Sequence, residues 1–314
     1  MDEITSLAQQ RVPFLFVISY DKSKIFSQKL NELDNNILFK IGKYRNYSPI
    51  PIDKNYKLKK YLIDFKTYKQ EFKKVIEEIK SGNTYLLNLT FKTEIETDLS
   101  LKEIFIFAKA KYKLYFQDRF ISFSPEKFIE IQGDSISTYP MKGTIEAHIP
   151  NATEKILANK KEMAEHIMIV DLMRNDLAMV AKDVKVEKFR YIDKIKAGEK
   201  ELLQVSSKIT AKLSQNWKES LGKILNTILP AGSITGTPKR STINIIKNIE
   251  NYNRGFYSGV FGIFDGENLY SAVMIRFIEQ QNNKLYYKSG GGITIDSDAF
   301  SEYSELIDKI YLPL

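Results

Sequence analysis

Residues 113–140 read KLYFQDRFISFSPEKFIEIQGDSISTYP, and this stretch decides the fold class. Apolar and aromatic residues recur in short runs, and polar turn residues separate the runs, which is the pattern of β-strands. Gly133 and Asp134 stand inside the run at 128–140, at the place of a hairpin turn. The stretch therefore predicts antiparallel strands.

The flanking sequence shows strand and helix patterns in blocks. A helix at 68–81 is closed by Gly82, and a second begins at Pro238 with Thr237 as its N-cap. The segment SPIPID at 48–53 suggests an extended connection. Because blocks replace a regular βαβ alternation, we expect an α+β fold. The other expected strands are 14–20, 37–42, 85–95, 257–264, 269–278 and 284–289, and the other helices 153–180, 216–228 and 297–311.

Composition narrows the class of protein. The chain has 314 residues, 43% hydrophobic and 12% aromatic, which is typical of a globular protein with a sizeable core. It contains no run of 18 apolar residues and no basic leader before its first apolar stretch, so we expect a cytoplasmic protein without a membrane span. With no cysteine and two histidines, thiolate and multi-histidine metal sites are excluded. Carboxylates remain, and they favour hard cations such as Mg2+.

The net charge of +8 suits an anionic partner. Nucleic-acid binders usually gather their basic residues on one face with aromatic residues between them. Here the lysines are spread along the chain, apart from short clusters such as 54–69. An anionic small molecule is therefore a better expectation than nucleic acid.

Two helical stretches carry paired carboxylates. Glu162 and Glu165 lie three residues apart, and Glu302 and Glu305 repeat this spacing, with Lys309 four residues later. On a helix, residues at this spacing share one face. If the two pairs meet, they offer four carboxylates to one hard cation. The alternative is that each pair belongs to an ordinary solvated face.

Two glycine-rich segments are candidate anion cradles. LPAGSITGTPKRST at 229–242 precedes an expected helix start, whose free N–H groups suit a carboxylate or phosphate. KSGGGITIDSDAF at 288–300 allows a ligand to approach the backbone closely. Neither segment has the spacing of a phosphate loop or a dinucleotide fingerprint. Both could equally be turns.

Two basic residues stand in unusual surroundings. Arg276 interrupts the apolar strand pattern SAVMIRFIE, and it could bind a substrate carboxylate or form an internal salt bridge. Lys142 follows a strand pattern, in TYPMKGT. If Lys142 is desolvated, it could act as a nucleophile, whereas most lysines near turns are solvated.

Taken together, the segments resemble the chorismate-utilising enzymes, the family of anthranilate, isochorismate, salicylate and aminodeoxychorismate synthases. This resemblance implies two large antiparallel sheets packed as a sandwich with flanking helices. It implies one catalytic domain over 1–314, with a short variable part at 1–80 and the motifs at 81–314. The motifs, in order, are SGNTYLLNLT, SPEKF, PMKGT, EHIMIVDLMRNDL, PAGSITGTPK, YSGVFG, VMIRF, SGGGITIDSD and EYSELIDK.

The resemblance also implies roles for the candidate residues. Glu165 and Glu305 would contact Mg2+ directly, and Glu162 and Glu302 mainly through water. Glu126 would be the general acid for the C4 hydroxyl. The residues expected to bind the substrate are Arg276, Tyr257, Gly290, Gly291, Gly292, Lys309, Ser233 and Thr144.

Lys142 points to one branch of this family. The resemblance implies lysine here in aminodeoxychorismate synthases and alanine in the other branches. The Lys142 amine would attack C2 of chorismate while Glu126 protonates the C4 hydroxyl, and ammonia would then add at C4 and expel the lysine. Burial and a nearby Mg2+ would both lower the pKa of this lysine. Leu86 replaces a usually polar residue, which argues against the isochorismate and salicylate branches.

The expected reaction needs a source of ammonia. This chain has no cysteine to serve as a glutaminase nucleophile, so ammonia would come from solution or from a separate glutamine amidotransferase subunit. The alternatives are anthranilate synthase component I, which Lys142 opposes because it would occupy the C2 face, and a catalytically silent binding subunit. Every acidic and glycine motif is present, which disfavours the silent subunit.

Overall fold

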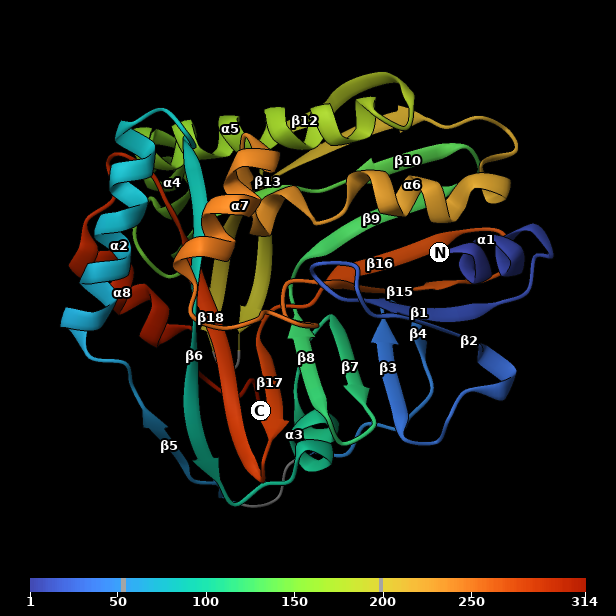
Figure 1. The fold of residues 1–314 in the computed structure, drawn as a ribbon, viewed down its shortest axis with the longest axis horizontal. Coiled ribbons are helices and arrows are strands. Elements are labelled where there is room, and N and C mark those ends of the chain that lie inside the picture. Colours follow the sequence, from blue (N-terminus) through green and yellow to red (C-terminus); the bar gives the residue numbers. More distant parts are fainter. Residues whose placement is uncertain (52–54, 198–199) are drawn as a thin grey trace. The chain divides into compact units, whose positions relative to one another are not determined.

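The computed structural model describes residues 1–51, 55–197 and 200–314. The chain divides into two compact units, and each unit contains one large antiparallel sheet (Figure 1). Residues 52 and 53 of the connection expected at 48–53 lie outside the described residues. Unit 1 consists of Met1–Leu33, Glu126–Ser233 and Gly259–Val273, and unit 2 consists of Asp34–Pro125, Ile234–Ser258 and Met274–Leu314.

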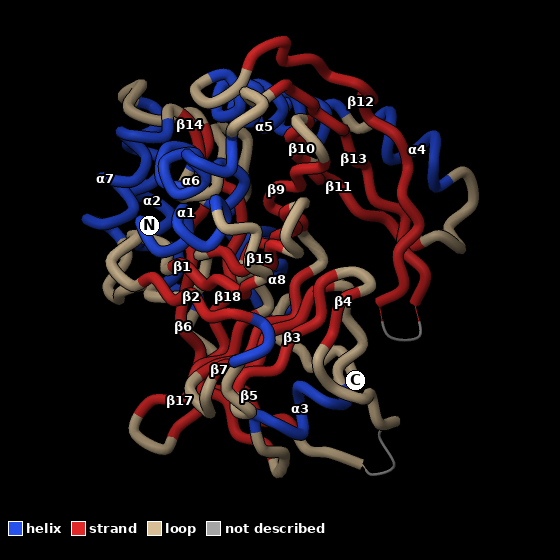
Figure 2. The backbone as a smooth tube through the Cα atoms, turned by 90° about the vertical axis from the view of Figure 1, so that its right-hand side faces the viewer, coloured by secondary structure: helices blue, strands red, loops and turns tan. Residues whose placement is uncertain are grey.

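The sheet of unit 1 has nine strands among the residues described. Its strands β12 and β13 form a long hairpin, and β11 lies along β13 (Figure 2). The strand order is β11 (Met141–Glu146), β13 (Lys200–Lys212), β10 (Ser135–Thr138), β9 (Lys127–Gln132), β16 (Leu269–Val273), β15 (Val260–Phe264), β1 (Phe14–Ile18) and β2 (Ile25–Lys29), with β12 (Lys182–Ala197) paired to β13.

Four helices in the described part of unit 1 accompany this sheet. The longest is α5 (Lys160–Ala178), which packs on β11, β12 and β13, and α4 (Ala152–Ala158) precedes it. The other two helices pack on each other, α1 (Asp2–Gln9) on α6 (Leu221–Ile228). Short 3-10 turns lie at Leu30–Glu32, Trp217–Ser220 and Gly232–Ile234.

The sheet of unit 2 also has nine described strands. Both β7 and β8 are buried along their whole length, which explains their continuous apolar and aromatic character. The strand order is β14 (Gly236–Thr237), β6 (Leu86–Thr97), β18 (Lys284–Ile293), β17 (Phe277–Gln281), β8 (Phe120–Ser124), β7 (Tyr112–Phe116), β3 (Ile37–Ile41) and β4 (Tyr44–Arg45), with β5 (Leu58–Tyr61) paired to β6.

Three of the helices described in unit 2 gather on β6 and β18. They are α2 (Phe65–Lys80), α7 (Lys239–Ile249) and α8 (Ala299–Asp308), and Figure 1 shows α2 and α8 side by side. The fourth, α3 (Leu101–Phe107), packs Ile104 and Phe105 on β7 and β8. In the described ranges no helix is long and apolar enough to cross a membrane.

The two antiparallel sheets with their helices confirm the α+β prediction. The hairpin turn at Gly133 is also confirmed, because Gly133 adopts a left-handed φ of 59° between β9 and β10. The sequence did not predict α1 or the β12–β13 hairpin. Charged residues in β12 hide its strand pattern.

Three local predictions are wrong. The helix expected at 153–180 is two helices, because Asn159 is extended and its side chain caps α5. Thr237 is not the N-cap of α7, because Pro238 holds that position. Thr237 lies in β14 and pairs with Leu86 of β6. Arg276 does not lie in a strand, because β16 ends at Val273 and β17 begins at Phe277.

Candidate active site

Lys142 lies at an irregularity near the start of β11. The pairing of β11 with β13 shifts between Met141 and Thr144, and Gly143 has a φ of +81°, which a residue with a side chain rarely adopts. The Nζ of Lys142 lies 3.1 Å from Oε2 of Glu165 on α5, and these side chains are 20% and 7% exposed. The bulge and the ion pair together hold the lysine against α5.

Glu162 lies beside the same bulge. A Cβ built on Gly143 would stand 3.2 Å from Oε2 of Glu162. Asn159 accepts a hydrogen bond from the Glu162 amide, so this glutamate stands in the first turn of α5, where a negative charge is favoured. Lys142, Glu162 and Glu165 are therefore brought together in unit 1, whereas the side chain of Thr144 is exposed.

His166 borders this cluster, and the sequence did not single it out as a site residue. It is fully buried, and its Nε2 lies 2.7 Å from Oγ of Ser207. The backbone amide of Arg190 donates to the same Oγ, so Ser207 joins the imidazole to β12. Burial lowers the pKa of His166 to about 4, helped by the charges of Arg190 and Lys142, so the ring is neutral at pH 7.

Glu126 stands just before β9 and accepts a hydrogen bond from Ser233. The resemblance placed Ser233 near the substrate carboxylate, whereas the structure directs its hydroxyl to the expected general acid. The loop that carries Ser233 lies close to α5, because a Cβ on Gly232 would stand 3.0 Å from Leu172. Ser233 thus links the loop to Glu126.

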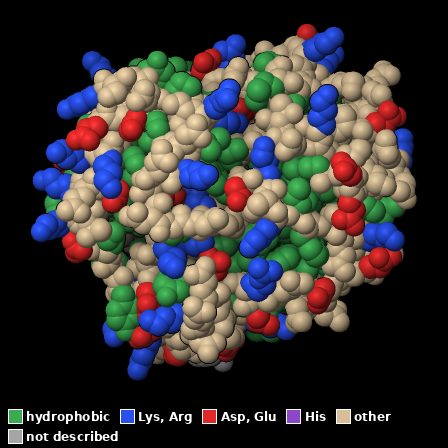
Figure 3. Space-filling model, in the orientation of Figure 1, with side chains coloured by type: hydrophobic (Ala, Val, Ile, Leu, Met, Phe, Trp, Pro, Cys, Tyr) green, Lys and Arg blue, Asp and Glu red, His purple; other side chains and the backbone are tan. Residues whose placement is uncertain are grey.

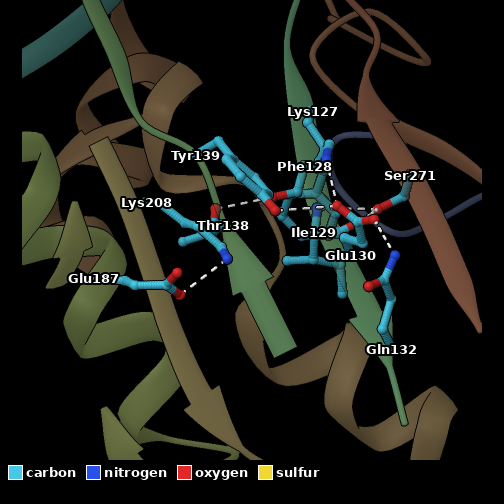
Figure 4. A network of polar contacts seen from close by, with 10 residues as sticks. All are labelled: Lys127, Phe128, Ile129, Glu130, Gln132, Thr138, Tyr139, Glu187, Lys208 and Ser271. Carbon is cyan, nitrogen blue, oxygen red and sulfur yellow. Dashed lines mark hydrogen bonds and ion pairs between the residues drawn. The ribbon is translucent and has the colours of Figure 1, made fainter. Parts of the chain in front are cut away.

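A polar network fixes the strands that lead from Glu126 to Lys142. Figure 4 shows Lys127, Gln132 and Tyr139 pointing toward Glu130 on β9. The hydroxyl of Tyr139 donates to Glu130 over 3.1 Å, and the amide of Gln132 over 2.7 Å. Tyr139 directly precedes Pro140, whose carbonyl accepts from the Ser207 amide. The start of β11 is therefore anchored on both sides.

In unit 2, α8 presents the second carboxylate pair to the glycine segment. Gly290–Gly292 form part of β18 and pair with Asn88–Thr90 of β6, so they are a strand and not a turn. A Cβ on Gly291 would stand 3.5 Å from Oε2 of Glu302, 3.8 Å from Nζ of Lys309 and 4.0 Å from Oε1 of Glu305. The glycines let the acidic pair approach the strand.

Lys309 ties α8 to that strand. Its Nζ donates to the Gly290 carbonyl over 2.7 Å and lies 2.6 Å from Oε1 of Glu305. Asp298 caps α8 by accepting from the Ser301 amide, which places Glu302 in the first turn. Glu302 is buried and accepts from Ser297, whereas 55% of the Glu305 side chain is exposed.

Arg276 occupies the short link between β16 and β17. Its φ of +51° is strained for a residue with a side chain, and such strain is often kept at functional sites. Burial acts to lower the pKa of Arg276, but the hydroxyls of Tyr287 and Tyr311 outweigh it and raise the pKa. Among the residues described, its buried Nε has no hydrogen-bond partner. This donor is available to a ligand carboxylate.

Tyr257 lies near Arg276 and is 4% exposed. Burial raises its pKa to about 12, so its hydroxyl keeps its proton and can donate to an anion. Tyr287 and Tyr311 are further neighbours of Arg276 that the sequence did not single out. Arg276 and Tyr257, two of the expected carboxylate ligands, are thus neighbours in unit 2.

The four expected Mg2+ ligands are divided between the units. Glu162 and Glu165 belong to unit 1, and Glu302 and Glu305 belong to unit 2. Within the described ranges, no group of three or more His, Asp or Glu could hold a metal by itself. Each pair supplies only carboxylate oxygens and lies beside a glycine, which fits a hard cation. The Mg2+ site stays a prediction.

Basic side chains do not form one continuous patch on the face shown in Figure 3. Lys and Arg side chains are interspersed there with Asp and Glu side chains. The expectation that nucleic acid is not a partner stays a prediction.

Comparisons with known proteins agree on the family. The family model described as chorismate binding enzyme matches residues 5–314. An uncharacterized PabA-like protein of Haemophilus influenzae is 50% identical, covering 100% of this chain and 96% of that protein. Aminodeoxychorismate synthase component 1 of Escherichia coli is 32% identical, covering 77% of this chain and 56% of that protein. In fold, the chain is similar to the menaquinone-specific isochorismate synthase MenF of Escherichia coli, with a TM-score of 0.72, 14% identity, and coverage of 98% of this chain and 79% of that chain.

Proposed function

Because this chain belongs to the family of chorismate-binding enzymes, we propose that it aminates chorismate at C4 to give 4-amino-4-deoxychorismate. The geometry of Lys142 carries the proposal. A largely buried amine is held at a strand bulge by Glu165. Mg2+ bound to Glu165 would compete for that carboxylate and favour the neutral amine, which is the nucleophilic form. The similarity to aminodeoxychorismate synthase component 1 supports the same reaction.

The proposed chemistry uses two side chains of unit 1. The neutral amine of Lys142 forms a bond to C2, both ring double bonds shift by one position, and the C4 hydroxyl leaves as water with a proton from Glu126. Ammonia then forms a bond to C4, both double bonds shift back, Lys142 leaves C2 as the neutral amine, and the new nitrogen at C4 returns a proton to Glu126. The net reaction replaces the C4 hydroxyl by an amino group, and the enolpyruvyl group is kept. Ser233 orients Glu126 for its proton transfer.

Substrate binding in the proposal relies on charge. Arg276 and Tyr257, with amides of Gly290–Gly292, would hold the enolpyruvyl carboxylate, and the unpartnered Nε of Arg276 supports this role. Glu165 and Glu305 would hold Mg2+ directly, and Glu162 and Glu302 through water. The ion would supply positive charge for the ring carboxylate.

The proposed source of ammonia is a separate glutamine amidotransferase subunit. This chain contains no cysteine for the glutaminase step. The proposal predicts that ammonium salt alone supports the reaction in vitro, and that a glutaminase subunit lets glutamine replace it.

The test is to incubate the purified protein with chorismate, Mg2+ and ammonium salt, and to resolve the products by liquid chromatography and mass spectrometry. We expect a non-aromatic aminated product that retains its enolpyruvyl group. The Lys142→Ala variant should lose at least about a hundredfold in rate, because a covalent route is removed. Lys185→Ala, which removes an exposed lysine of β12, is the matched control and should retain the rate.

Two outcomes would contradict the proposal. Anthranilate together with pyruvate would assign the protein to the C2-aminating reaction. An unchanged rate in Lys142→Ala would show that this lysine does not form the adduct. A chelator should abolish product formation in the wild type, and retention of activity would remove Mg2+ from the proposal.

A further inference from the structure

A buried ion pair follows the C-terminal end of α7. Glu250 and Arg254 are each 2% exposed at the side chain. Nε of Arg254 donates to Oε2 of Glu250 over 2.8 Å, and Nη2 donates to Oε1 over 2.6 Å. This bidentate geometry fixes both side chains. Removing two charges from water costs free energy, so a buried ion pair need not stabilise the fold. A role other than stabilisation is therefore worth seeking for this pair.

The pair fills a gap along one edge of β6. On this edge β14 pairs with Leu86 and Leu87, and β5 pairs with Glu94–Thr97, so the described strands leave the middle of β6 without a neighbour. Oε1 of Glu250 accepts from the Thr90 amide over 3.0 Å and from its hydroxyl over 2.7 Å. Nη2 of Arg254 donates to the Asn88 carbonyl over 2.7 Å. The side chains thus satisfy backbone groups that a strand would otherwise pair.

The anchored part of β6 lies opposite the glycine segment. Thr90 pairs with Gly290, and Asn88 pairs with Gly292. Glycine strands are weakly specified in register, because they lack side chains that pack on either face. An anchor on the neighbouring strand therefore sets where the amides of Gly290–Gly292 stand.

Arg254 also holds the turn that carries Tyr257. The Tyr257 amide donates to the Arg254 carbonyl over 3.1 Å, and Nζ of buried Lys288 donates to the same carbonyl over 3.0 Å. Nη1 of Arg254 donates to the Ile234 carbonyl over 2.9 Å. The guanidinium of Arg254 therefore contacts the segment after Ser233, and its carbonyl contacts both the Tyr257 turn and β18, the strand that carries the glycines.

We propose that Glu250 and Arg254 are a positioning pair for substrate binding. They set the register of Gly290–Gly292 and the place of Tyr257, and so determine the affinity for the enolpyruvyl carboxylate without touching it. Nε, Nη1 and Nη2 of Arg254 all donate within the protein, in contrast to the unpartnered Nε of Arg276. This inference rests on the proposed function for the identity of the ligand.

The test compares KM for chorismate with kcat in Arg254→Lys and Glu250→Gln. Measurements are made at a temperature where circular dichroism shows that each variant is folded. We expect KM to rise about tenfold, a loss typical of one misplaced charged hydrogen bond, while kcat changes by less than about threefold. A purely structural role would lower thermal stability and leave KM of the folded protein unchanged, and that result overturns the proposal.

Lys284→Ala is the matched control. It removes the ion pair with Glu94, which joins the same strands, β18 and β6, at their far end. KM should stay at the wild-type value. An equal rise in KM here would show that any weakening of these strands has the same effect, and would overturn the assignment to Glu250 and Arg254.

A milder variant keeps the proposal testable if Arg254→Lys does not fold. Thr90→Val removes the hydroxyl that bonds to Glu250 and Tyr252 but keeps the β-branched shape that suits a strand. KM should rise in the same direction by a smaller factor, and an unchanged KM counts against the pair. If the wild type makes anthranilate or no product, the proposed function fails. The positioning pair is then tested by titrating the wild type and the variants with chorismate and comparing their Kd values.

Discussion

The hydroxyl of Ser233 donates a hydrogen bond to the carboxyl group of Glu126, which we propose as the general acid. A hydrogen bond to the neutral, protonated acid contributes about 0.5–1.5 kcal/mol, enough to favour one orientation of the carboxyl group. This single contact distinguishes two roles for Ser233. A residue that orients the acid acts on kcat, whereas a residue that binds the substrate carboxylate acts on KM.

We therefore expect Ser233→Ala to lower kcat about tenfold and to leave KM within about twofold of wild type. Ser214→Ala, which removes an exposed hydroxyl in the same unit, is the control and should change neither constant. Steady-state kinetics with chorismate as the varied substrate checks the prediction. A higher KM with an unchanged kcat would return Ser233 to the substrate carboxylate.

Lys113 of β7 is a buried lysine whose surroundings make the stability of the protein depend on pH. It is 1% exposed, and its Nζ donates to the carbonyls of Phe105 and Ala108, each over 2.7 Å, at the C-terminal end of α3. Burial lowers its pKa to about 7, and the charge of Lys40 acts in the same direction. An unfolded lysine titrates near 10.4. Between these values the unfolded chain binds more protons, so stability rises with pH.

We expect the free energy of unfolding to rise by up to about 2 kcal/mol between pH 7 and pH 9 because of Lys113. The carbonyls of α3 favour the charged form, so this figure is an upper bound. Urea unfolding of wild type and Lys113→Met at both pH values isolates the contribution. The same dependence on pH in both proteins would contradict the prediction.

In each expected carboxylate pair, the first glutamate lies in the first turn of a helix, and a side chain caps the N-terminus of that helix. Asn159 caps α5 ahead of Glu162, and Asp298 caps α8 ahead of Glu302. In each case the cap satisfies an amide that the helix leaves unpaired, and the helix dipole favours the nearby carboxylate. The break at Asn159 that interrupts the expected long helix is therefore the feature that places Glu162 beside Gly143.

Asn159→Ala should lower the free energy of unfolding by about 1 kcal/mol, which is the usual cost of losing an N-cap. Asn159→Asp keeps a capping oxygen and should retain most of the wild-type stability. Urea denaturation of the three proteins checks the prediction. Equal losses in the alanine and aspartate variants would show that the side-chain cap contributes nothing.

Each unit of the molecule is assembled from three separated segments of the chain. The sheet of unit 1 places β16 next to β9 and β1 next to β15, although the members of each pair are far apart in the sequence. The apolar run at 269–278 predicts a single strand. In the structure β16 ends in one sheet at Val273, and β17 begins in the other sheet at Phe277. Apolar periodicity indicates which residues are buried, and both sheets bury their strands. The pattern therefore does not show at which residue the chain passes from one sheet to the other.

The sequence by itself determined the α+β class, the antiparallel hairpins and the positions of the family motifs, because turn residues and side-chain periodicity act between near neighbours. Tertiary structure alone decided which motifs meet. Ser233 and Glu126 are 107 residues apart, and Thr90 and Glu250 are 160 residues apart. Contacts over such separations depend on sheet register and on the packing of helices against strands, which local sequence does not encode.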